Sequence, residues 1–84
     1  MYTFVPSGIC SKEIQFNIQE GAVKDVVFLG GCSGNLQGIS KLIEGMNANE
    51  AITKLRGIAC GMKKTSCPDQ LAIALEEALL EKAV

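Results

Sequence analysis

The stretch EIQFNIQEGAVKDVVFL, residues 13–29, decides the fold of this chain. In its first part three apolar residues alternate with polar ones: Ile14, Phe16 and Ile18. A period of two is typical of a strand with one buried face. Glu20-Gly21 then predicts a turn, and residues 22–29 predict a strand that ends in a continuous apolar run. With a short β-like run at residues 2–5, stopped by Pro6, the pattern predicts a three-stranded antiparallel meander.

The sequence changes period after this stretch. Gly30 and Gly31 end the third strand. Apolar residues then recur at helical spacing: Leu36, Ile39, Leu42, Ile43 and Met46. Asn49 is the expected cap of a short second helix, and Pro68 suits the first turn of a final one. The expected buried stripe of that final helix is Leu71, Leu75, Ala78 and Leu79. We therefore predict an α+β fold, a three-stranded antiparallel sheet followed by two or three helices packed on one face.

Length and charge limit the range of functions. The chain has 84 residues, enough for one domain over 1–84, and eight Lys and Arg against nine Asp and Glu give a net charge of −1. This balance provides no field that would recruit nucleic acid or an anionic membrane surface. No apolar run approaches the roughly 18 residues of a membrane span, and the start lacks the pattern of an export signal. We expect a soluble cytoplasmic protein that is too small for multidomain enzyme chemistry.

Four cysteines, in a chain without histidine, are the main candidates for chemistry: Cys10, Cys32, Cys60 and Cys67. Three of them fall at predicted junctions between elements, where ligands from distant parts of a chain can converge. An even count in a short chain fits two disulfides, one metal site, or buried thiols that pack as small apolar groups. Without an export signal, disulfides are the weaker choice. Four thiolates can close a tetrahedral site around Zn²⁺ or hold an iron–sulfur centre.

Few other groups could take part in chemistry. Lys63-Lys64 and a position at a helix N-terminus would favour the thiolate form of Cys67. These lysines are candidates for contact with an anion or a partner, and the alternative is a solvated loop. Asp69 is interpreted as a first-turn dipole partner, and Glu76-Glu77 as a solvated helix face. Because the chain has no histidine for a Ser/His or Cys/His nucleophile, we expect no catalytic residues.

The segment Thr65-Ser66-Cys67-Pro68-Asp69, followed by Gln70-Leu71-Ala72, resembles the signature of the TSCPD domain family. The resemblance covers essentially the whole chain, because Cys10, Gly31-Cys32 and Cys60-Gly61-Met62 stand where small four-cysteine members have their other cysteines. Related domains occur at the C-terminus of adenosylcobalamin-dependent ribonucleotide reductases. The resemblance therefore implies a setting in nucleotide reduction, with a reductase catalytic chain as a candidate partner. The radical chemistry of such a reductase needs a large barrel that 84 residues cannot contain.

A second resemblance concerns architecture. A cysteine before the alternating strand, the run 26–32, and a cysteine at the start of the final helix are similar to the order of elements in IscU-type iron–sulfur scaffold proteins. That resemblance implies that Cys10, Cys32 and Cys67 gather at one end of the sheet, with Cys60 completing the set. The chain departs from the scaffolds in having Lys12 where they have Asp, and in lacking their chaperone-docking segment before the third cysteine.

Two functional hypotheses and one about assembly follow. The first is a zinc-binding accessory or interaction domain with four thiolate ligands, in which metal binding stabilises a thin core. The alternative is an iron–sulfur or metal-transfer scaffold, or a thiol redox protein. Ile73 and Leu80 lie seven residues apart, nearly in line along the final helix, and predict a two-fold homodimer through that face.

Overall fold

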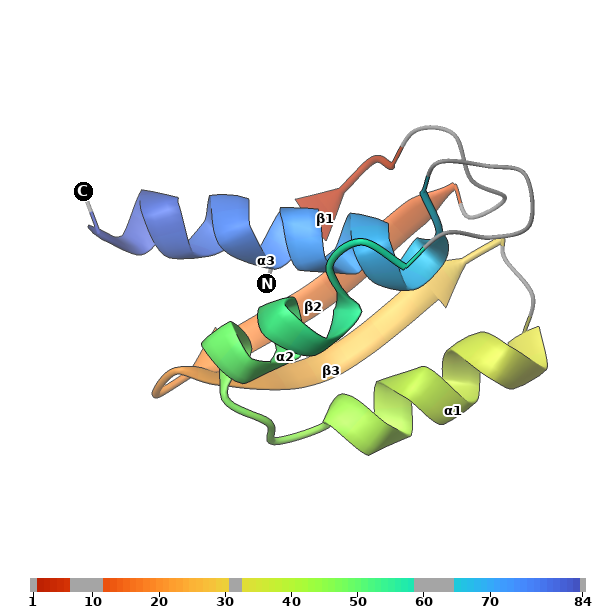
Figure 1. Cartoon of the computed structure of the whole chain (residues 1–84), viewed down its shortest axis with the longest axis horizontal. Helices are drawn as coiled ribbons and strands as arrows, with labels where there is room; N and C mark the ends of the chain where they lie inside the picture. The colour runs from red at the N-terminus through yellow and green to blue at the C-terminus, as the bar shows by residue number, and fades with distance from the viewer. Residues whose placement is uncertain (1, 7–11, 31–32, 59–64, 84) are drawn as a thin grey trace.

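The computed structural model describes residues 2–6, 12–30, 33–58 and 65–83. Within these residues a three-stranded antiparallel sheet is followed by three helices, which confirms the predicted α+β fold (Figure 1). The elements in chain order are β1 (Tyr2–Phe4), β2 (Glu13–Gln19), β3 (Ala22–Leu29), α1 (Ser33–Ile43), α2 (Ala48–Leu55) and α3 (Cys67–Ala83). None of the helices in this described part is long and apolar enough to cross a membrane.

The central strand of the sheet is β2, because the strand order is β1-β2-β3. Phe4 of β1 and Phe28 of β3 both pair with Ile14, so β1 ends, β2 begins and β3 ends at the same end of the sheet. The N–H of Lys12 donates to the carbonyl of Leu29 at 2.7 Å and extends the pairing there. The alternation predicted for β2 is confirmed, since its apolar side chains lie in the core: Ile14, Phe16 and Ile18.

The helices α2 and α3 lie over one face of the sheet, and α1 runs alongside β3 (Figure 1). The stripe predicted for α3 faces the core, with Leu71, Leu75 and Ala78 buried and Leu79 partly buried. The prediction of Asn49 as the cap of α2 is wrong. The cap is Asn47, whose side-chain oxygen accepts the N–H groups of Asn49 and Glu50 at 2.9 and 3.2 Å. Asn49 is the second residue of α2, so its own N–H has no partner within the helix and needs the side-chain oxygen of Asn47.

A β-bulge in β3 changes which apolar side chains reach the core. The register between β2 and β3 shifts where Asp25 adopts a positive φ of 55°. As a result Val23 and Val26, three residues apart, are both buried, whereas Val27 is 43% exposed. The N–H of Asp25 donates to the carboxylate of Glu44, just beyond the end of α1, at 2.9 Å. The bulge is thus held in place by a side chain 19 residues away along the chain.

A two-residue turn joins β2 to β3. Gln19 pairs with Ala22, and the two residues between them, Glu20 and Gly21, have φ angles of 53° and 80°. Positive φ at both central positions is the pattern of a type I′ turn, which matches the twist of a hairpin. Glycine adopts this conformation freely, whereas a residue with a Cβ is strained there by about 1 kcal/mol.

We expect Glu20→Asn to stabilise the protein, because Asn tolerates positive φ and is preferred before Gly in this turn. The gain is about 0.5 kcal/mol, or a rise of about 3 °C in Tm for a domain of this size. Thermal unfolding followed by circular dichroism measures it. Glu20→Gln is the matched control, since it removes the same charge without the preference for positive φ. A Tm of Glu20→Asn no higher than that of Glu20→Gln would contradict the expectation.

Candidate metal centre

The first turn of α3 is capped by Ser66. Its hydroxyl oxygen accepts the N–H of Asp69 at 3.2 Å, and its carbonyl accepts the N–H of Gln70 at 2.9 Å. Cys67 is the first residue of the helix, and Pro68 is the second, where an N–H would have no partner within the helix. The Ser-x-x-Asp spacing is a capping pattern, and it fixes where α3 begins.

Asp69 carries a buried carboxylate, only 4% exposed, that accepts three hydrogen bonds. Its Oδ1 accepts the N–H of Gly57 at 2.7 Å and the guanidinium of Arg56 at 3.2 Å. Its Oδ2 accepts the hydroxyl of Thr65 at 2.6 Å. These donors, Thr65 and Gly57 foremost, lower the pKa of Asp69 below its usual value. The carboxylate is therefore ionised at neutral pH although it is buried.

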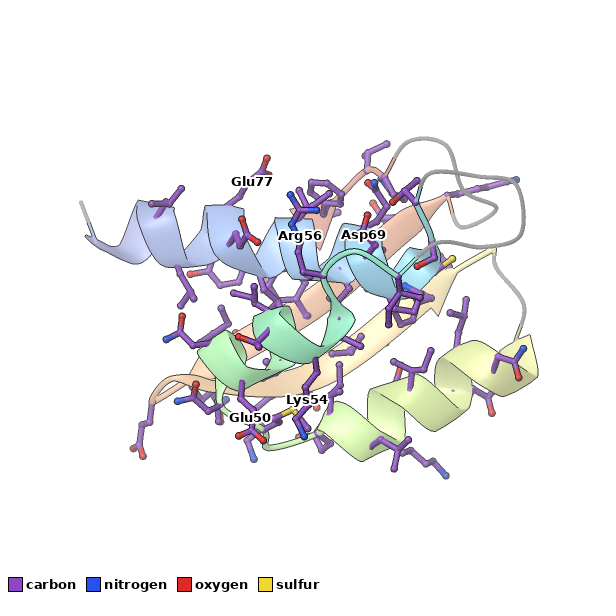
Figure 2. All side chains as sticks on the ribbon, viewed as in Figure 1. Glu50, Lys54, Arg56, Asp69 and Glu77 are labelled. Atoms are coloured by element: carbon purple, nitrogen blue, oxygen red, sulfur yellow. The ribbon has the colours of Figure 1, made fainter. Side chains whose placement is uncertain are left out.

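One cluster joins the end of α2 to the start of α3, and we call it the Asp69 clasp: Arg56, Gly57, Thr65, Ser66 and Asp69. Figure 2 shows Arg56 and Asp69 side by side over α3, near the chain that leaves α2. The hydroxyl of Ser66 donates to the carbonyl of Ile58 at 2.6 Å, while Arg56 Nε donates to Glu76 at 3.1 Å. The clasp thus fixes the residues that follow α2 against the first turns of α3.

The sequence interpretation of the acidic residues missed this cluster. Asp69 does lie in the first turn of α3, as expected of a dipole partner, but its carboxylate is buried and also binds residues outside the helix. Glu76, interpreted as part of a solvated face, is half-buried and pairs with Arg56. The Ser-x-x-Asp capping pattern was the one local signal. The contact between Arg56 and Asp69 spans 13 residues and has no local signature.

Of the predicted ligands, the described part of the chain includes Cys67, which begins α3 and is 8% exposed. The remaining predicted site residues lie outside the described residues: Cys10, Cys32, Cys60, Lys63 and Lys64. Among residues 2–6, 12–30, 33–58 and 65–83, no group of three or more His, Cys, Asp or Glu side chains is arranged to hold a metal ion. The four-cysteine site therefore stays a prediction.

The position of Cys67 fits a metal ligand. The thiol begins α3, on a turn that the hydrogen bonds of Ser66 and Asp69 hold in place. The neighbouring Asp69 does not compete for a metal ion, because both of its oxygens already accept hydrogen bonds. A metal ion at Cys67 would therefore need its other donors from elsewhere, and thiolates from Cys10, Cys32 and Cys60 would complete the all-sulfur set that Zn²⁺ accepts in structural sites.

The protein is a small α+β domain whose last helix begins at Cys67 and is capped by Ser66. Comparison with known families makes this assignment more specific. The chain matches the family described as TSCPD domain over residues 2–79, nearly its whole length. It belongs to the TSCPD domain family. No curated protein and no solved structure matches the chain, so its resemblance to IscU-type scaffolds stays a prediction.

We expect Asp69→Asn to destabilise the fold by about 2 kcal/mol, because an amide nitrogen cannot accept a hydrogen bond and one donor of the clasp loses its partner. Thermal unfolding should show a decrease in Tm of about 10 °C. The matched control is Glu77→Gln, which removes one charge from an exposed residue on the side of α3 away from α2 (Figure 2). Equal Tm values for the two variants would show that the clasp does not stabilise the fold.

Proposed function

We propose that this TSCPD domain is a small zinc-binding domain with Cys10, Cys32, Cys60 and Cys67 as ligands, and that it acts as an accessory or interaction module without catalysis of its own. The observation that carries the proposal is the position of Cys67. It is a buried thiol at the positive end of a 17-residue helix whose start is fixed by hydrogen bonds to another part of the chain.

Two of the proposed ligands are close in sequence to described residues at one end of the sheet, which supports a single metal site. Cys10 precedes Lys12 by two residues and Cys32 follows Gly30 by two residues, and two residues span at most about 7 Å. Lys12 and Gly30 are neighbours, because a Cβ added to Gly30 would lie 3.1 Å from the Lys12 side chain. In Figure 1 this end of the sheet and the start of α3 lie toward the same end of the long axis. The described residues that flank Cys10 and Cys32 in the sequence therefore lie toward the end of the molecule where α3 begins, which supports the proposal of one site.

The composition of the core supports a stabilising role for a metal ion. Among the described residues, five of the buried side chains are alanines: Ala48, Ala51, Ala72, Ala74 and Ala78. Each alanine removes little apolar surface from water. The core therefore contributes less to the free energy of folding than a core with the same number of larger side chains. The net free energy of unfolding of a native domain is only about 5–15 kcal/mol, so a core of small side chains leaves little margin. Binding of zinc to thiolates contributes about 10 kcal/mol or more in small peptides, enough to offset this deficit.

Metal analysis of protein purified without oxygen tests the proposal. We expect one zinc per chain in a colourless protein, and loss of that zinc in Cys67→Ser. Asn47→Ala is the control, because it removes the cap of α2 and costs about 1 kcal/mol without altering a thiol; it should keep its zinc. A brown protein that contains iron would support the scaffold alternative instead. A metal-free wild type with two disulfides would exclude both functions.

The partner we propose is a ribonucleotide reductase catalytic chain, on the strength of the family resemblance, and we also propose self-association through α3. Leu80 is 68% exposed on that helix, and Ile73 is partly buried. Sedimentation velocity of the chain alone should show a dimer that Leu80→Glu dissociates. A complex should sediment when an adenosylcobalamin-dependent reductase is added. A monomer at high concentration would exclude the dimer, and unchanged boundaries in the mixture would exclude the partner.

A further inference from the structure

The hydrogen bonds of the Asp69 clasp surround the position of Cys67. Ser66, immediately before the cysteine, donates to the carbonyl of Ile58 at 2.6 Å and accepts the N–H of Asp69. Asp69, two residues after it, is bound by Gly57 and Thr65 at 2.7 and 2.6 Å. The backbone that carries the thiol is therefore attached on both sides to residues outside the helix. Pro68, directly after the cysteine, further restricts the backbone because its φ is fixed.

We propose that Asp69, together with Arg56, is a positioning residue for Cys67 as a metal ligand. This inference rests on the proposed zinc function. Neither side chain is a ligand in the proposed site. They act by holding the first turn of α3 in one place, so that the thiolate need not be ordered when the metal ion binds. Side chains that orient a ligand without touching the metal typically change metal affinity by ten- to a hundredfold when they are replaced.

Arg56 acts through Asp69. Its guanidinium lies 3.2 Å from Asp69 Oδ1, and Arg56 is the C-cap residue of α2. Through this contact the end of α2 helps to hold the carboxylate that fixes the start of α3.

Position and charge predict different results for Asp69→Asn. If the clasp acts by position, the variant binds zinc more weakly, because the first turn of α3 loses an acceptor for its donors. If only charge matters, the variant binds zinc more tightly, because a negative charge near the thiolate has been removed. Arg56→Gln weakens binding in both cases. Thr65→Val separates the two effects without any change in charge, since it removes only the 2.6 Å hydrogen bond to Asp69.

The experiment measures zinc affinity of the full chain by competition with a chromophoric chelator, and records the absorption spectrum of the Co²⁺-substituted protein. We expect Asp69→Asn, Arg56→Gln and Thr65→Val each to weaken zinc binding by about tenfold or more. The ligand-field bands of Co²⁺ should shift in all three, because they report the arrangement of the ligands. A residue that contributed only to global stability would leave those bands unchanged in the folded protein.

Two controls separate position from stability. Asn47→Ala removes the cap of α2, away from the clasp, and should keep the affinity and the spectrum of the wild type. Glu76→Gln removes the other ion pair of Arg56 and leaves Asp69 intact, so it should do the same. If Asp69→Asn fails to fold, the zinc affinity and the Co²⁺ spectrum of Thr65→Val alone decide whether the clasp positions Cys67.

Wild-type affinity and wild-type bands in Thr65→Val would overturn the positioning role, as would tighter zinc binding by Asp69→Asn. In both of these cases the wild type still binds zinc, so the proposed function stands. A wild type that binds neither zinc nor Co²⁺ would remove the proposed function and this inference with it.

Discussion

The Asp69 carboxylate is buried where the residues that follow α2 meet the start of α3, and several of the other buried side chains of these two helices are alanines. A buried negative charge costs several kcal/mol unless hydrogen-bond donors and an opposite charge replace the water that it loses. Here the donors come from Arg56 and Gly57, which follow α2, and from Thr65, which precedes α3. The carboxylate is satisfied only when both helix ends are in place. It therefore makes the arrangement of α2 and α3 specific in a way that alanine packing alone would not.

The same constraint explains the residues that give the family its name. Thr65 and Asp69 bond to each other, and Ser66 caps the helix while it holds the carbonyl of Ile58. Pro68 occupies a first-turn position where an N–H is not needed. Four of the five residues in the Thr65–Asp69 segment thus have a structural reason for their identity that is independent of any ligand. The fifth, Cys67, is the residue for which the proposed metal site would supply the reason.

Sequence reasoning succeeded where the signal was local and periodic. The alternation in β2 and the apolar stripe of α3 each repeat over several residues, so a single atypical residue could not hide them. The bulge at Asp25 has no such pattern, because it depends on the carboxylate of Glu44, 19 residues away. The cap of α2 was misplaced by two residues, since Asn47 and Asn49 are both good caps and only tertiary context decides between them. The four-cysteine site could be suggested from the sequence by count and by resemblance, while its geometry depends on Cys10, Cys32 and Cys60, which lie outside the described residues.

The clasp and the proposed metal site place different demands on the same turn. The hydrogen bonds of the clasp use hydroxyl, carboxylate, guanidinium and backbone groups. The proposed metal site uses thiolates, so the clasp and the site share no atoms. Both nevertheless constrain the backbone of one turn of α3. A turn that is already fixed loses less conformational entropy when a ligand binds, and a site of this kind binds its ion more tightly for the same donors. In a domain with a thin core, hydrogen bonds at the start of α3 therefore contribute to stability directly and, in the proposed site, would contribute through Cys67 to the affinity for its metal ion.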